Sequence, residues 1–156
     1  MTITSAICNS FKQEILVGTH NFTASSGNTF KLSLYSSDSA TLSKSTTAYT
    51  APSDGTANPT NTYEVTSTAS GYTTGGNSLT SVTPVLSSDT ACCKFADTSW
   101  GSSASFTARG CLIYNSSASN KAVCAINFGA DKTVTSGTFT IQFPAQTAGN
   151  AIIQIA

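Results

Sequence analysis

The chain has 156 residues, and its seven lysine and arginine residues balance its seven aspartate and glutamate residues, so the formal net charge is zero. Charged residues make up 9% of the sequence, against roughly 25% in an average soluble domain. This balance argues against a basic groove for nucleic acid, because phosphate binding needs clustered lysine and arginine side chains. It also excludes a polybasic membrane anchor and an acidic tail. The length fits one domain, residues 1–156, with one hydrophobic core.

Serine and threonine take the place of the charged residues, with 25 and 26 copies. Threonine favours strands because its β-branched side chain suits a pleated surface, and serine is common in turns and on exposed strand faces. Eight phenylalanines and five tyrosines supply the bulk of a core, unlike a disordered serine-rich tract. The composition predicts a folded, mainly β protein with a polar surface.

The start of the sequence carries neither a positively charged segment nor the long apolar stretch of a secretory leader. No apolar run approaches the roughly 18 residues of a membrane-spanning helix. We therefore expect a protein that is made in a cytoplasm, stays soluble there and has no membrane partner.

An amphipathic helix is predicted over residues 3–17. Apolar residues recur there at steps of three and four and fall on one helix face: Ile3, Ile7, Cys8, Phe11 and Ile15. Thr4 or Ser5 can cap the start, and Gly18 stands where the glycine after a helix end belongs. We expect the apolar face to cover the protein's own core, with a docking arm as the alternative.

After the helix the hydrophobic period changes to two. Residues 30–35 alternate apolar Phe30, Leu32 and Leu34 with more polar neighbours, the pattern of a half-buried antiparallel strand. Further short strands are predicted at residues 63–66, 79–83, 91–95, 106–114, 122–128, 139–143 and 151–155, with a hairpin loop at 115–120. About eight short strands without a βαβ pattern predict an antiparallel β-sandwich, jelly-roll or immunoglobulin-like, with a short N-terminal helix.

Residues 36–61 are predicted to be a long loop insertion with little regular structure. Turn signals fill this segment, including Pro52, Asp54-Gly55 and Asn58-Pro59. Long loops on rigid β scaffolds often carry binding sites. A solvent-exposed insertion without a function is the alternative, and the sequence favours neither.

The sequence shows no pattern of a catalytic, cofactor or metal site. Its single histidine, His20, follows the predicted helix, where a surface or capping role is the commoner one. The serines form no Gly-x-Ser-x-Gly elbow, and the carboxylates are scattered, with Asp131 read as a turn residue in a local ion pair. We therefore predict a non-enzymatic protein that needs no cofactor and no metal.

The five cysteines lack the paired spacing of a zinc site. A hairpin of residues 109–115 and 121–128 would place Cys111 opposite Cys124, either as a cross-strand disulfide or as a pair of buried thiols. Cytoplasmic synthesis favours thiols. Cys92 and Cys93 are adjacent in a predicted strand and would point to opposite faces, so at most one of them is expected in the core.

The chain ends in an uncharged, strongly β-prone segment, residues 151–156. Such a strand aggregates when it is exposed at a sheet edge, so it must be buried or covered by a partner subunit. We expect it to complete the core of its own chain. If a partner covers it instead, the candidate interface residues are Ile152, Ile153 and Ile155.

Three segments carry turn and strand motifs that can be compared with a known family. They are residues 2–12 with 14–16 and 18–22, residues 29–35 with the later Glu64-Val65, Gly71-Tyr72 and Gly75-Gly76, and residues 127–144 with Asn127-Phe128-Gly129-Ala130-Asp131-Lys132. These segments resemble small virion proteins of tailed bacteriophages, including phages of cyanobacteria and marine bacteria. Together they span nearly the whole chain, but their motifs are turns and strand patterns. The loop around residues 52–61 and the Cys92-Cys93 pair depart from the family pattern, which puts contacts with neighbouring subunits in doubt.

The resemblance implies a capsid decoration, or cement, protein on the surface of a virion, synthesised in the host bacterial cytoplasm. It implies binding to the major capsid protein or other virion proteins, as a homo-oligomer that we take to be a trimer, and no catalytic residue. The first alternative is a neck, tail or fibre-adaptor protein of the virion. The second is a carbohydrate-binding module, which would need exposed aromatic side chains; the candidates are Tyr49, Tyr63, Tyr72 and Trp100.

Overall fold

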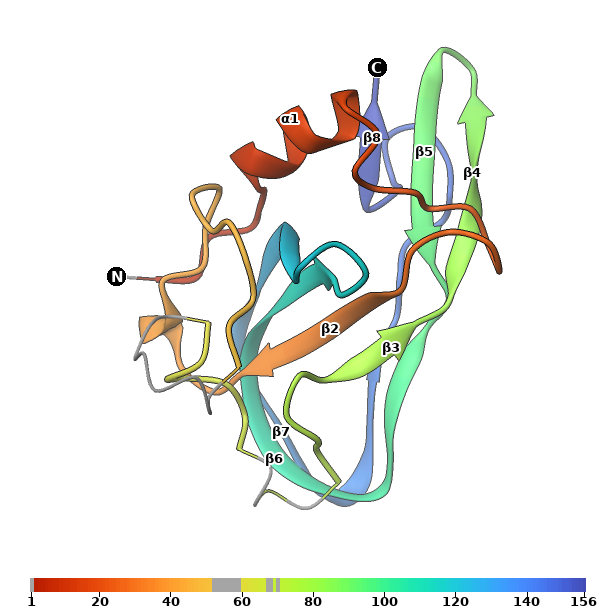
Figure 1. Ribbon diagram of the computed structural model, residues 1–156. Helices are drawn as coiled ribbons and strands as arrows, with labels where there is room; N and C mark the ends of the chain where they lie inside the picture. Colours follow the sequence, from red (N-terminus) through yellow and green to blue (C-terminus); the bar gives the residue numbers. More distant parts are fainter. Residues whose placement is uncertain (1, 52–59, 67–68, 70) are drawn as a thin grey trace.

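The computed structural model describes residues 2–51, 60–66, 69 and 71–156, and it confirms a mainly β fold consistent with an antiparallel β-sandwich. Its described residues form eight strands in two sheets, one α-helix and one 3-10 turn (Figure 1). The large sheet has the strand order β1-β7-β6-β2-β3, and the small sheet has the order β4-β5-β8. The strands of the large sheet are β1 (Ala6–Ile7), β2 (Phe30–Tyr35), β3 (Asn77–Leu79), β6 (Thr98–Asn115) and β7 (Lys121–Ile141). Those of the small sheet are β4 (Ser81–Ser87), β5 (Thr90–Phe95) and β8 (Ile153–Ile155).

Short connections carry the chain between the two sheets. A single residue, Thr80, separates β3 from β4, and residues 96–97 separate β5 from β6. The predicted strand 79–83 is therefore divided between the two sheets, and Pro84 lies inside β4 instead of ending it. Proline is tolerated there because β4 is an edge strand and its pairing with β5 is irregular between Val82 and Val85.

The predicted helix over residues 3–17 is wrong in its first half, because α1 spans only Asn9–Leu16 and residues 6–7 form β1. Ile3 and Ile7 fit a period of four and a period of two equally well, and pairing of Ala6 and Ile7 with β7 decides for the strand. Cys8 takes the N-cap position without a side-chain hydrogen bond, so Thr4 and Ser5 are not caps. Phe11 is the buried residue of α1 and packs into the core, as expected.

An aromatic row connects the helix to both sheets. Phe11 lies edge-on to Phe22 with ring centroids 6.0 Å apart, and Phe22 stacks on Phe30 of β2 at 4.3 Å. Phe30 in turn contacts Phe95 of β5 at 5.5 Å, and Phe95 contacts Phe143 at 5.6 Å. Because aromatic side chains bury large apolar areas, this row makes the space between the sheets one continuous core.

The segment after β2 covers the second face of the large sheet, so β2 is not half-buried as predicted. Ser33 and Tyr35, expected to face solvent, are both fully buried. The Tyr35 hydroxyl donates to the carbonyl of Thr60 at 3.0 Å, and the ring of Tyr49 stacks on Tyr114 at 4.4 Å. The described part of the predicted loop is thus packed against the sheet and includes the 3-10 turn η1 (Asp38–Ala40). The predicted turns at residues 52–59 lie outside the described residues.

The remaining strand predictions differ mainly in length. Strand β5 agrees with the predicted 91–95, and β8 covers the last three residues of the predicted 151–155. The predicted strand 63–66 is replaced by an isolated bridge between Tyr35 and Glu64. Strands β6 and β7 contain 18 and 21 residues, since the predicted 122–128 and 139–143 join into one strand that ends at Ile141. Irregular pairing along β6 and β7 lets these long strands curve together within the large sheet (Figure 1).

Candidate interaction surface

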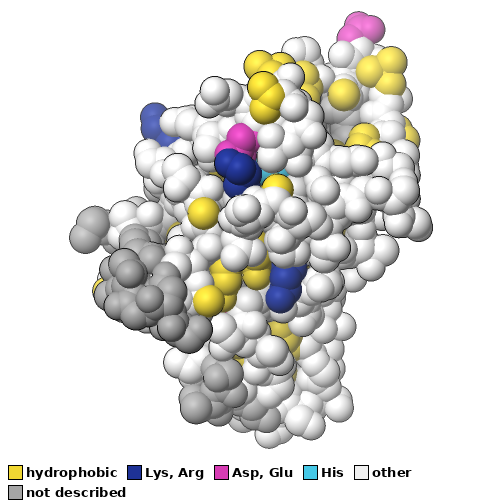
Figure 2. Space-filling view, viewed as in Figure 1, with side chains coloured by type: hydrophobic (Ala, Val, Ile, Leu, Met, Phe, Trp, Pro, Cys, Tyr) yellow, Lys and Arg dark blue, Asp and Glu magenta, His cyan; other side chains and the backbone are white. Residues whose placement is uncertain are grey.

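Exposed apolar side chains gather at one end of the molecule. Leu16 and Val17 at the end of α1 are 85% and 73% exposed, and Leu86 near the tip of the β4–β5 hairpin is 74% exposed. Val85 and Ile155 are also exposed, and we call these five residues the apolar end. Figure 1 places the end of α1, the end of β8 and the β4–β5 tip on the same side of the molecule, and Figure 2 shows apolar side chains at this side. Large side chains clustered in this way are typical of a binding surface.

The end of α1 is fixed by backbone hydrogen bonds that hold Leu16 and Val17 in place. The amide of Gly18 donates to the carbonyl of Ile15 at 3.2 Å, and the amide of Thr19 donates to that of Glu14 at 3.0 Å. Gly18 has φ of +73°, as predicted for the glycine after a helix end. This Schellman-type ending stops the helix while Leu16 and Val17 still point into solvent.

An apolar furrow runs from the apolar end along the open side of the sandwich. It consists of three adjoining hollows of about 370, 270 and 500 Å³. The first lies between α1 and β8, the second between β1, β7 and Ile152, and the third between the two halves of β7 and Pro144. Ile7 lines both the first and the second hollow, and Ile126 and Ile152 line both the second and the third. We call these three hollows together the furrow.

The three isoleucines predicted as interface residues have different positions. Ile153 is buried in the core, Ile152 is half-buried in the furrow, and Ile155 is 57% exposed. Strand β8 pairs with β5 through Cys92 and Cys93, so the end segment does join its own sheet. Ile153 thus completes the core as expected, while Ile155 is exposed and its contact with a partner stays a prediction.

The five cysteines are free and buried. Cys111 lies opposite Ile126, and Cys124 lies opposite Ile113, so the predicted direct pairing of Cys111 with Cys124 is wrong by two residues. Cys92 and Cys93 are both buried, and of the two only Cys93 belongs to the core cluster, as expected for neighbours that point to opposite faces. Burial raises the pKa of the Cys8 thiol to about 11 and that of Cys93 to about 12, so these thiols are poor nucleophiles at neutral pH.

His20 is buried, so the prediction of a surface residue is wrong. Its ring connects α1 to the β6–β7 hairpin. Its Nε2 lies 2.9 Å from Glu14 Oε2, and its Nδ1 lies 3.0 Å from Asn115 Nδ2. The amide of Ser117 donates to Asn115 Oδ1, which fixes Asn115 Nδ2 as the donor to the ring. Both ring nitrogens are therefore engaged inside the protein.

Glu14 receives a second partner on the same side of α1. Lys121 Nζ donates to Glu14 Oε1 at 2.6 Å. Burial acts to raise the pKa of Glu14, but hydrogen bonds and charge from Lys121 and His20 outweigh it and lower the pKa. The Glu14 carboxylate thus holds the helix on β7 and is not among the residues that line the furrow.

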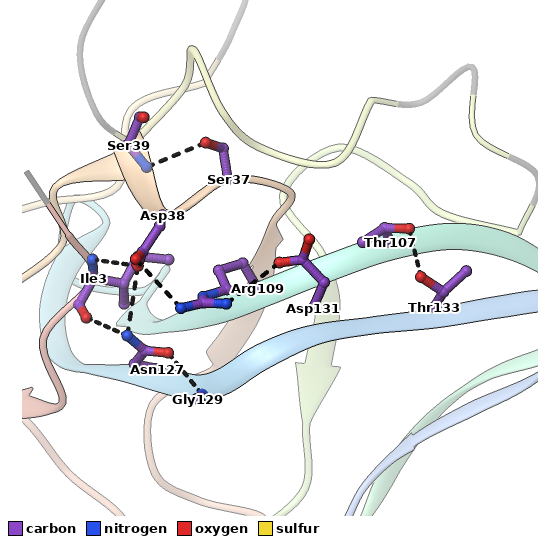
Figure 3. A network of polar contacts seen from close by, with 10 residues as sticks. All are labelled: Ile3, Ser37, Asp38, Ser39, Thr107, Arg109, Asn127, Gly129, Asp131 and Thr133. Carbon is purple, nitrogen blue, oxygen red and sulfur yellow. Dashed lines mark hydrogen bonds and ion pairs between the residues drawn. The ribbon is translucent and has the colours of Figure 1, made fainter.

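A second polar network fastens the N-terminal segment to the long strands (Figure 3). The Arg109 guanidinium lies between two carboxylates, 3.3 Å from Asp38 and 3.6 Å from Asp131. Asp38 also accepts the amide of Ile3 at 3.0 Å, and Asn127 donates to the Ile3 carbonyl at 2.6 Å. Asp131 lies in β7 and pairs across the sheet, so the prediction of a turn residue with a local partner is wrong. The network therefore has a structural role, since each carboxylate in it has a partner.

A third polar group surrounds Glu64 beneath the segment that covers the large sheet. Its carboxylate accepts hydrogen bonds from the hydroxyls of Tyr49 at 2.9 Å and Tyr72 at 2.7 Å, and from the amide of Gly75 at 2.6 Å. The Tyr72 hydroxyl also accepts the amide of Leu34 at 3.1 Å. Glu64 thereby joins the covering segment to β2, and its pKa is raised by burial in spite of these donors.

The sequence reasoning missed the apolar end. Its members Leu16, Val17 and Leu86 belong to no pattern that was singled out. A usable signal was nevertheless present, because Ile15, Leu16 and Val17 are three consecutive apolar residues and therefore cannot all lie on one helix face. Along the described part of the chain, no helix is long and apolar enough to cross a membrane, and no cluster of side chains could hold a metal ion.

Comparison with known proteins adds no relative: no protein-family model, curated protein or solved structure matches this chain.

Proposed function

We propose that this protein is a non-enzymatic structural protein of a bacteriophage virion, and that it decorates and stabilises the capsid shell. The observation that carries the proposal is the apolar end, where five exposed apolar side chains extend from an otherwise polar module. Burial of such side chains against a partner is the main source of affinity in protein assembly. The sequence resemblance to small virion proteins supplies the kind of partner, which is the major capsid protein.

The construction of the module supports a mechanical role. One core runs through both sheets, and three polar networks fasten the N-terminal segment and the helix to the long strands and the covering segment to β2. A rigid module can transmit load between the capsid subunits that it bridges. In a symmetric shell the same contact would be repeated, so a modest apolar patch on each copy would suffice. A homo-oligomer, which we take to be a trimer, would multiply the contact further.

The aromatic side chains give the carbohydrate-binding alternative no support. Tyr49, Tyr72 and Trp100 are buried, and Tyr63 is half-buried, so these four provide no exposed stacking platform. A neck, tail or fibre-adaptor protein would use the same apolar end, and it differs from a decoration protein chiefly in copy number.

The copy number per purified virus particle therefore tests the proposal, by quantitative mass spectrometry against the major capsid protein. A copy number comparable with that of the capsid protein is expected for decoration. A few copies per particle would replace decoration by the neck or tail alternative, and absence from the particle would overturn a virion role.

Variants of the apolar end provide the matching binding assay on shells that lack the protein. Leu16→Ser combined with Leu86→Ser should abolish shell binding and leave the fold intact, because both side chains are mostly exposed. Thr135→Ala, an exposed change outside the apolar end, is the control and should bind like the wild type. Unchanged binding by the double variant would exclude this surface as the contact.

A further inference from the structure

The furrow lies between two sheet edges that are open to further pairing. Strand β8 is at one end of the small sheet, with β5 on one side and no strand of the described chain on the other. Strand β1 is at the end of the large sheet and covers only Cys124 and Ala125 of the long strand β7. An edge strand presents a row of main-chain donors and acceptors, so the furrow combines an apolar floor with an edge that can accept another strand.

Two lysines are the charged side chains that line the furrow among the described residues. Lys12 lines the hollow at one end and Lys132 the hollow at the other, and no carboxylate side chain lines any of the three among the described residues. The nearest acidic residues in sequence are already paired elsewhere, Glu14 with Lys121 and His20, and Asp131 with Arg109. The middle of the furrow is therefore lined by uncharged side chains, and a lysine lies at each end.

We propose that the furrow binds an extended segment of a partner protein, apolar at alternate positions and acidic near both ends. The segment would pair with the free edge of β8, and every second side chain would enter the hollows beside Ile7 and Ile152. The acidic residues would meet Lys12 and Lys132. This surface shares Leu16 and Ile155 with the apolar end and extends beyond it to Lys132, and the inference does not depend on a virion location.

The charge pattern favours a foreign segment over a second copy of this chain. Two copies joined at β8 by a two-fold axis would bring the same positively charged furrow from each side. Like charges in such a contact oppose association, and among the described residues no acidic side chain lines the furrow to compensate them. A partner segment with acidic ends has no such conflict.

A synthetic peptide tests this inference directly. The probe is a short peptide with alternating valine and threonine and an aspartate at each end, and the comparison peptide carries lysine at both ends. The full chain should bind the acidic peptide about tenfold more tightly in fluorescence anisotropy, since two ion pairs contribute. Hydrogen exchange should show new protection at the amides of Ile153–Ile155, which a contact through side chains alone would not give.

Reversal of the two lysines provides the decisive variant. Lys12→Glu combined with Lys132→Glu should bind the lysine-ended peptide better than the acidic one, with no change in the core. Lys44→Glu is the matched control, because Lys44 is exposed and lies outside the furrow. Three results would each overturn the inference: no binding of either peptide by the folded protein, a preference that the double reversal leaves unchanged, or concentration-dependent dimers that protect Ile153–Ile155 without peptide.

Discussion

Glu64 shows how a single buried residue sets a dependence of stability on pH. Three donors satisfy its carboxylate, from Tyr49, Tyr72 and Gly75, yet burial still raises its pKa above the ordinary value. Because the folded-state pKa is the higher one, the contribution of Glu64 to stability is complete below the pKa of the unfolded chain. It is lost as the pH rises through the folded-state pKa.

The unfolding free energy of Glu64→Gln should therefore increase relative to that of the wild type as the pH rises from about 4 to about 7. Glutamine keeps most of the contacts and removes the charge that burial disfavours. Glu64→Ala is the matched control, and it should lose about 1–3 kcal/mol across the whole range, because Tyr49 and Tyr72 lose their acceptor. Urea unfolding at a series of pH values measures both differences. A constant difference between wild type and Glu64→Gln would show that Glu64 does not titrate in this interval.

The roles of the buried polar residues could not be predicted from the sequence. His20 and Asn115 are 95 positions apart, and Arg109 and Asp38 are 71 apart, so no local pattern connects either pair. A histidine after a helix is ordinarily exposed, and only the rings of Phe11 and Phe30 around His20 show why this one is buried. The thiols were easier to predict, since free cysteine is among the most commonly buried residue types.

At the scale of the element, helix α1 ends close to the residue that the sequence predicts, but it begins later than predicted. Gly18 adopts φ of +73°, a conformation that only glycine enters without strain. The end of the helix can therefore be predicted from the local sequence. The N-terminal signal was ambiguous because Ile3 and Ile7 suit a strand as well as a helix, and long-range pairing with β7 decided between them. The lengths of β6 and β7 were underestimated for a similar reason. The two strands stay paired through their irregular positions, and this long-range pairing cannot be seen in the sequence.

Gly18→Ala should destabilise the protein by about 1 kcal/mol, because alanine at this positive φ strains the backbone. A methyl group at this position meets no atom within 4 Å, so steric overlap with neighbours does not contribute. Gly101→Ala is the matched control, since its added methyl also meets nothing within 4 Å but its φ is not positive. That variant should remain within about 0.5 kcal/mol of the wild type in urea unfolding. Equal losses for the two variants would contradict a role for the backbone conformation of Gly18.

At the scale of the whole molecule, the small sheet depends on the end of the chain. Strand β8 is its third strand, and without it β4 and β5 would remain as a two-stranded hairpin, which is marginal in water. Ile153 carries the link to the shared core, while Ile155 on the same strand is exposed and belongs to the apolar end. Ile153 and Ile155 are two residues apart and lie on the same face of β8, so stability and the proposed recognition differ by position along the strand, with Ile153 in the core and Ile155 beyond it.

Two identical substitutions on β8 should separate these tasks. Ile153→Ala should cost about 2–5 kcal/mol of unfolding free energy, because it leaves a cavity in the core that both sheets share. Ile155→Ala should change the unfolding free energy by less than about 0.5 kcal/mol, because its side chain is mostly in water already. Thermal and urea unfolding measure the first effect, and binding of the acidic peptide measures the second, since Ile155 lines the furrow. If Ile155→Ala lowered stability as much as Ile153→Ala, the end of β8 would be part of the core, and both the apolar end and the furrow would lose their basis.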